Sequence, residues 1–160
     1  MKLLEAIKKV LGEQIQGCRQ MMDLLQREKV YLLDLQMEGV EAVTKEKDSL
    51  VLKLRLLEEE RIRLFDCLIA ENPQGILTKC QDPEKLTLQR LAEITGETIF
   101  REIRSKLISL SQSIKELNDL NKVMIDRTLN FLKKNNNFLG TFYPGAPAMG
   151  EKGGLLSREI

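Results

Sequence analysis

The chain has 160 residues, 42% apolar, 31% charged and only 4% aromatic, a composition that suits one domain with a modest core. Its 25 Lys and Arg nearly balance 24 Asp and Glu, so a formal charge of +1 gives no field that attracts nucleic acid. The absence of histidine removes the commonest general base and metal ligand, which argues against an enzyme. Abundant Leu, Glu and Lys without Trp predict an all-α fold.

The three cysteines, Cys18, Cys67 and Cys80, are far apart, and no C-x-x-C pair occurs. With no histidine to complete a tetrahedral site, they predict free or structural thiols and no metal or cofactor. No apolar run approaches the roughly 18 to 20 residues that a membrane span needs. We therefore expect a cytoplasmic protein with no membrane insertion.

The first predicted element is one long helix over about residues 2–37. From Leu4 onward, an apolar residue falls at every seventh position, and a second seam follows three residues on. This second seam has polar gaps at Gln14 and Glu28. Gly39 then offers a C′ residue that tolerates the left-handed conformation, so it is expected to end the helix.

A second long helix is predicted over about residues 40–70, because the seven-residue period restarts at Val43. Its charge run, residues 58–63, is interpreted as a solvated face. Pro73 ends the element, since proline removes a backbone donor and disfavours the helical conformation in the residue before it. The first two helices together predict an antiparallel hairpin.

A short helix is predicted over about residues 83–95. Asp82 and Pro83 suit the N-cap and first helical position, and Thr87 offers a competing N-cap one turn later. Gly96 marks the end of the element.

The last predicted helix, about residues 97–139, is the longest. Apolar residues recur by sevens from Ile103 to Phe138, but the second seam turns polar at Asn121 and Thr128. A buried Asn needs hydrogen-bond partners, and on a helical seam it fixes register or partner choice. The alternative is that the bundle ends before this point and the helix continues alone into water.

Residues 140–160 contain five glycines and two prolines and predict a flexible tail after a helical bundle over residues 1–139. Phe142 and Tyr143 lie at the junction, close to Phe138. These aromatic side chains either pack against the helix end or anchor a partner. The predicted fold is thus an antiparallel bundle of three long helices and one short one, with a tail.

Three segments, in an order that covers nearly the whole chain, carry a family resemblance. They are Met37-Glu38-Gly39 with Arg61, Leu86-Thr87-Leu88 with Leu91-Ala92, and Leu117-Asn118-Asp119-Leu120-Asn121 followed by Ile125, Leu129, Phe131, Leu132, Tyr143 and Gly145. The L-N-x-x-N element and the spacing of the apolar residues after it are the most specific part. Together the segments resemble the FlgN family of flagellar export chaperones.

The resemblance implies a cytoplasmic chaperone that is not an enzyme. Such a protein binds C-terminal helical segments of hook-filament junction proteins, prevents their premature association and delivers them to the flagellar type III export gate. Carried over residue by residue, client binding falls on Leu117, Asn118, Asn121, Met124, Ile125, Leu129 and Leu132. The resemblance also makes Tyr143 the contact for the export gate.

Two other functions remain as alternatives. The first is a structural coiled-coil adaptor that dimerises through its last helix, for which Phe131 and Phe138 on the seven-residue stripe are suited. The second is a helical bundle that binds nucleic acid. The largest basic cluster is only Lys133-Lys134, which argues against this alternative. We therefore expect no nucleic-acid partner.

Overall fold

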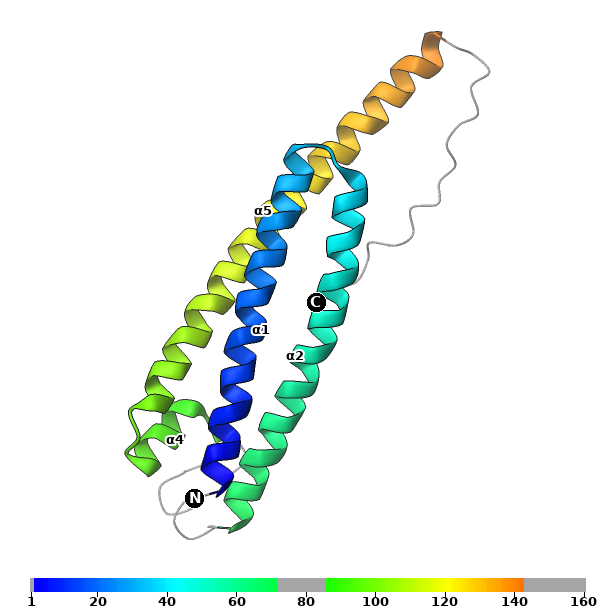
Figure 1. Cartoon of the computed structure of the whole chain (residues 1–160). Helices are drawn as coiled ribbons and strands as arrows, with labels where there is room; N and C mark the ends of the chain where they lie inside the picture. Colours follow the sequence, from blue (N-terminus) through cyan, green and yellow to red (C-terminus); the bar gives the residue numbers. More distant parts are fainter. Residues whose placement is uncertain (1, 72–85, 143–160) are drawn as a thin grey trace. The chain divides into compact units, whose positions relative to one another are not determined.

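The computed structural model describes residues 2–71 and 86–142. Within these ranges the chain forms helices and no strand, which confirms the predicted all-α fold (Figure 1). The helices are α1 (Lys2–Leu33), α2 (Met37–Glu71), α4 (Leu88–Thr95) and α5 (Ile99–Phe142). None of these helices is long and apolar enough to cross a membrane.

The chain divides into two compact units, Met1–Val123 and Met124–Ile160. The first unit contains α1, α2, α4 and the first part of α5. In the second unit the described residues, 124–142, are the remainder of α5. The predicted tail lies outside the described residues, apart from its first three, which continue α5.

The turn between α1 and α2 differs from the prediction. Leu35, not Gly39, adopts the left-handed conformation, with a φ of 54°. The backbone N–H of Gln36 donates to the carbonyl of Tyr31 at 2.8 Å, and that of Leu35 donates to the carbonyl of Leu32 at 3.3 Å. This pairing is a Schellman motif, which satisfies the last carbonyls of α1 and turns the chain within three residues.

Gly39 lies inside the first turns of α2, so its predicted role as the residue that ends α1 was wrong. A Cβ atom at this position would lie 2.6 Å from ring atoms of Tyr31. The glycine is therefore required by a close approach: it leaves room for the Tyr31 ring against α2.

The short helix α4 begins after Thr87, the second of the two N-caps that the sequence offered. Thr87 Oγ1 accepts a hydrogen bond from the backbone N–H of Arg90 at 3.3 Å. The helix ends at Gly96, which has a φ of 72°. The other predicted cap, Asp82, lies outside the described residues.

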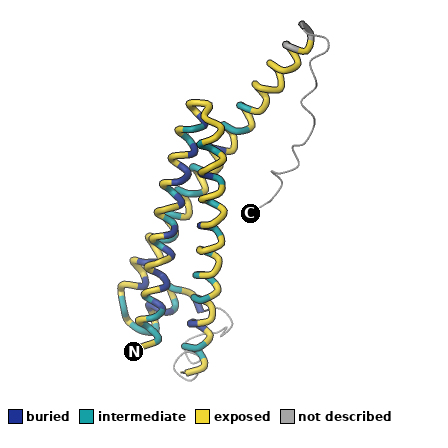
Figure 2. Tube along the Cα trace, turned by 45° about the vertical axis from the view of Figure 1, so that its right-hand side comes forward, coloured by how far each residue is buried: buried dark blue, intermediate teal, exposed yellow. Residues whose placement is uncertain are grey.

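Two apolar clusters form the core of the Met1–Val123 unit. One cluster joins α1, the end of α2, α4 and the start of α5, and the other joins α1, α2 and the middle of α5. The fully buried side chains of the first are Ile7, Leu11, Leu91 and Phe100, and the buried residues of the second are Met21, Leu24, Leu25, Val43 and Leu50. Buried positions follow α1 along most of its length (Figure 2), so α1 is the central element of this unit.

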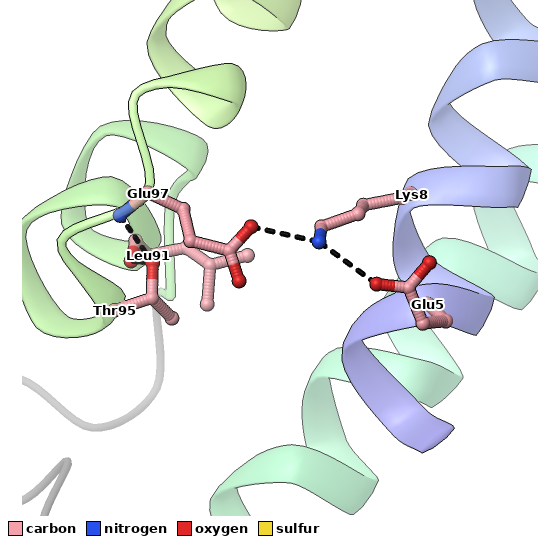
Figure 3. Close-up of polar contacts among 5 residues, drawn as sticks. All are labelled: Glu5, Lys8, Leu91, Thr95 and Glu97. Atoms are coloured by element: carbon pink, nitrogen blue, oxygen red, sulfur yellow. Dashed lines mark hydrogen bonds and ion pairs between the residues drawn. The ribbon is translucent and has the colours of Figure 1, made fainter. Parts of the chain in front are cut away.

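Lys8 connects α1 to the turn between α4 and α5 (Figure 3). Its Nζ lies 2.7 Å from a Glu97 carboxylate oxygen and 2.9 Å from one of Glu5. The hydrogen bond with Glu97 is the main reason that the pKa of Lys8 is raised. On the other side of the turn, the backbone N–H of Glu97 donates to Thr95 Oγ1, whose hydroxyl donates to the carbonyl of Leu91. These contacts fix the start of α5 beside α1.

Candidate binding surfaces

The predicted client-binding residues all lie on α5. In the Met1–Val123 unit, Leu117 is half-buried against the second core cluster, Asn118 is exposed, and Asn121 is almost completely buried, with 1% of its surface exposed. Asn118 and Asn121 are three residues apart, yet only Asn118 faces solvent. The two amides of the L-N-x-x-N element therefore have different environments.

The buried amide of Asn121 connects α5 to α1. Its Nδ2 donates to the carbonyl oxygen of Leu25 and to Glu28 Oε2, both at 2.8 Å. Its Oδ1 is buried and has no hydrogen-bond partner among the described residues. The alternative that the bundle ends before Asn121 is wrong, because this residue is inside the packed unit.

Glu28 carries a carboxylate into the interior, where 2% of its side chain is exposed. Lys47 Nζ approaches Glu28 Oε1 at 2.6 Å, and the Lys47 side chain retains 19% exposure. With Asn121, these residues form a network that we call the Glu28 network, in which α1, α2 and α5 each supply one member. A buried charge needs partners of this kind, and the network fixes how the three helices pair.

The other polar gap of α1, Gln14, also finds a partner on α2. Gln14 Nε2 donates to Glu58 Oε2 at 2.9 Å, and Arg61 Nε donates to the same carboxylate oxygen at 2.8 Å. The hydrogen bond from Arg61 is the main cause of the lowered pKa of Glu58. Arg61 also lies over the ring of Phe65, 4.9 Å from its centroid.

These contacts correct the interpretation of residues 58–63 as a solvated face. Glu58 and Arg61 are half-buried and belong to the bundle, whereas Arg63 pairs with Glu60 on the exposed side of α2. The sequence signal that identifies Glu58 and Arg61 is their helical spacing relative to the α2 core residues Leu54 and Phe65, which a count of charges does not reveal.

The 124–142 segment presents apolar side chains. Met124 and Ile125 are half-buried, while Leu129 and Leu132 have 43% and 49% of their surface exposed. Ile125, Leu129 and Leu132 follow the i, i+4, i+7 spacing of one helix face. Phe131 is 57% exposed and belongs to a neighbouring stripe. The predicted export-gate residue Tyr143 lies outside the described residues.

A groove of about 830 Å³ opens on the Met1–Val123 unit, between α2 and α5. Figure 1 shows α1 between these two helices, and α1 contributes Gln14 and Cys18 to the lining. Burial raises the pKa of the Cys18 thiol. We call this hollow the α2–α5 groove. Sequence reasoning missed it because it depends on how far apart two helices lie, which heptad spacing does not specify.

Within residues 2–71 and 86–142, no group of Cys, Asp and Glu side chains is arranged to hold a metal ion. The carboxylates of Glu28 and Glu58 are already bonded to Lys, Arg, Asn and Gln side chains. What this part of the chain offers is apolar helix surface with polar residues at fixed positions, which suits the binding of another helix.

Comparison with known proteins identifies one family. Its sequence model, described as FlgN protein, matches residues 1–141, which include all of α1, α2 and α4 and nearly all of α5. Tyr143 lies just beyond the matched residues. No curated protein and no solved structure matches the chain.

Proposed function

The chain belongs to the FlgN family, and we propose that it binds C-terminal helical segments of hook-filament junction proteins in the cytoplasm. The family is one of flagellar export chaperones and not of enzymes, so the general role is binding of flagellar export substrates. In our proposal, binding prevents premature association of the client, and the chaperone then delivers the client to the flagellar type III export gate. This role requires neither cofactor nor catalysis by the chain.

The observation that carries the proposal is the exposed apolar face of the 124–142 segment. Leu129 and Leu132 lie one turn apart, each with more than two fifths of its surface exposed, and Ile125 continues the face toward the N-terminus of α5. An amphipathic client helix can pack on such a face through its own apolar positions at i, i+3, i+4 and i+7. Met124 adds a thioether that adapts to different apolar partners.

The residues before this face have distinct proposed roles. Asn118 is exposed and can hydrogen-bond to a polar group of the client. Leu117 and Asn121 contribute through position, because Leu117 packs on the core and the Asn121 amide bonds to α1. They fix the rotation of α5 about its axis and hence the direction in which Asn118 points.

The test is calorimetric titration of a C-terminal fragment of a hook-filament junction protein into the wild-type chain and a Leu129→Lys, Leu132→Lys variant. We expect the affinity to fall at least tenfold, because two apolar contacts are replaced by charged groups that must be desolvated. The control is Leu56→Lys, a somewhat more exposed Leu on α2 with 56% exposure. Equal affinities for the wild type and the double variant would overturn the assignment of this face.

Tyr143 is proposed to contact the export gate. Tyr143→Ala should leave the calorimetric affinity for the client fragment unchanged and reduce secretion of the client in cells. Loss of client affinity in this variant would instead assign the ring to the client site.

The adaptor function has its own supporting observation. Phe131 and Phe138 are seven residues apart and 57% and 62% exposed. A coiled-coil adaptor would sediment as a dimer both with and without the client fragment. Sedimentation velocity of the purified chain with and without that fragment distinguishes the two functions.

A further inference from the structure

The α2–α5 groove has the length of a short helix. It extends along α2 from Leu54 to Ile69, with Cys18 of α1 in its lining. The opposite side is formed by α5 from Arg104 to Ser111 and by Leu86, Thr87 and Leu88 at the start of α4. At about 1.5 Å per residue, the α2 side measures roughly 22 Å, which corresponds to about four helical turns. All of these residues belong to the Met1–Val123 unit, so the groove shares no residue with the 124–142 face.

Apolar side chains stand on both walls of the groove. Ile62 on α2 and Ile108 on α5 are 48% and 50% exposed, and the more buried Phe65 and Leu107 lie deeper. Single exposed apolar residues are ordinary on protein surfaces. Here two exposed apolar residues, Ile62 and Ile108, line the same groove from different helices. A docked helix with an apolar stripe could pack against both of them.

The charges of the groove are arranged asymmetrically. On α2, Asp66 is exposed, and on α5, Arg104 is exposed. Among the described residues neither side chain has an ion-pair or hydrogen-bond partner, whereas Glu58 and Arg61 nearby pair with each other. The groove thus offers one unpaired anion on the α2 wall and one unpaired cation on the α5 wall.

We propose that the α2–α5 groove docks an amphipathic helix of the client, of about four turns, beside α2 and α5. The proposal rests on the proposed function, because it takes the same client as partner. The docked helix carries an apolar stripe flanked by a base that faces Asp66 and an acid that faces Arg104. It completes a four-helix arrangement with α1, α2 and α5, in which its apolar stripe packs between two neighbouring helices.

Charge favours the client over a second copy of this chain. The helix that another copy exposes, the 124–142 segment, carries one acid, Asp126, against the bases Arg127, Lys133 and Lys134. The charged residues that line the groove are two acids, Glu58 and Asp66, and two bases, Arg61 and Arg104, so the lining has no excess of negative charge to match a segment with two more bases than acids. A client helix with one acid and one base beside its apolar stripe can pair with both Arg104 and Asp66.

The first test compares Ile62→Lys with Leu56→Lys. Both replace an exposed apolar residue of α2 by the same cation, but only Ile62 lines the groove. In calorimetric titration of the C-terminal junction-protein fragment, we expect Ile62→Lys to weaken binding at least tenfold and Leu56→Lys to change it less than twofold. Circular dichroism of both variants should match the wild type, because both positions are about half exposed.

The second measurement uses Cys18 as a reporter within the groove. In a Cys67→Ser, Cys80→Ser chain, the client fragment should slow alkylation of Cys18 at least tenfold. A Leu56→Cys thiol, placed in a chain whose native cysteines are Ser, lies outside the groove and should react at an unchanged rate.

The outcomes separate the two proposals. If the fragment does not bind the wild-type chain, the proposed function fails and the groove proposal falls with it. If the fragment binds, but Ile62→Lys binds equally well and Cys18 stays reactive, only the groove proposal is overturned. If Cys18 is protected from alkylation in the client-free chain and becomes reactive on dilution, the groove is occupied by a second copy of this chain. That result also overturns the groove proposal.

Discussion

The Glu28 network predicts that replacing Lys47 and replacing Glu28 change the free energy of unfolding by different amounts. Glu28 is 2% exposed, whereas Lys47 retains 19% exposure. Lys47→Met removes the only cation within bonding distance of a buried carboxylate in the described structure, and the remaining partner, Asn121, is neutral. Removing one partner of a buried ion pair costs about 3 to 5 kcal/mol of unfolding free energy.

The reverse substitution should cost less. In Glu28→Gln, the Gln side chain can still accept the hydrogen bond from Asn121, and Lys47 can extend its ammonium group into solvent from its partly exposed position. The expected loss is about 1 kcal/mol, the value of one ordinary hydrogen bond. The double variant Glu28→Gln, Lys47→Met leaves no buried charge and should recover most of the stability lost in Lys47→Met.

Urea unfolding at neutral pH, followed by circular dichroism, measures all three variants. Thermal unfolding provides a second readout: at about 2 to 4 °C per kcal/mol for a chain of this size, Lys47→Met should lower the Tm by roughly 10 °C. A Lys47→Met chain within about 1 kcal/mol of the wild type, or more stable than Glu28→Gln, would refute the reasoning. Either result would mean that the Glu28 carboxylate is solvated and not part of a buried network.

Two further predictions concern stability against acid and the glycines of the hairpin. Because Arg61 lowers the folded-state pKa of Glu58, this pair stabilises the fold at pH values above the ordinary carboxyl pKa of 4.5, and the contribution is lost as the pH falls through the lowered value. Arg61→Gln should therefore flatten the loss of stability below pH 4.5 in acid titrations of unfolding free energy. Gly39→Ala should destabilise the chain by about 1 to 3 kcal/mol through its clash with Tyr31, whereas Gly12→Ala, with nothing within 4 Å, should stabilise it by up to about 1 kcal/mol in the same urea assay.

Much of the fold was accessible from the sequence because apolar spacing by sevens is a local signal. The series beginning at Leu4, Val43 and Ile103 each identified a helix that the structure contains. The end of α1 was less accessible. Gly39 carried the usual signature of a helix end, but Leu35 turns the chain, and the glycine instead makes space for Tyr31. Only the packing of α1 against α2 distinguishes these two uses of a glycine.

The candidate surfaces also differ in how far the sequence alone predicts them. The apolar face of Ile125, Leu129 and Leu132 follows from spacing and needs no knowledge of neighbouring helices. The contrast between Asn118 and Asn121 follows from spacing only in part. Asn121 lies on the second seam and Asn118 does not, but only the position of α1 shows that Asn121 is covered. The family resemblance identified the element as a whole but not the separate roles of its amides.

The two polar gaps of α1 explain why one level of the bundle is closed and another is open. Glu28 and Gln14 are two heptads apart, and each bonds to a residue of α2. At the level of Glu28, α5 supplies Asn121 and the three helices close. Two heptads earlier on α5, which runs parallel to α1, the corresponding residue is Leu107, which has no polar group to offer Gln14 and lines the α2–α5 groove. At the level of Glu28, the Asn121 amide holds α5 against α1. At the level of Gln14, α5 makes no polar contact with α1 within the described residues, and the α2–α5 groove opens there beside Gln14 and Glu58.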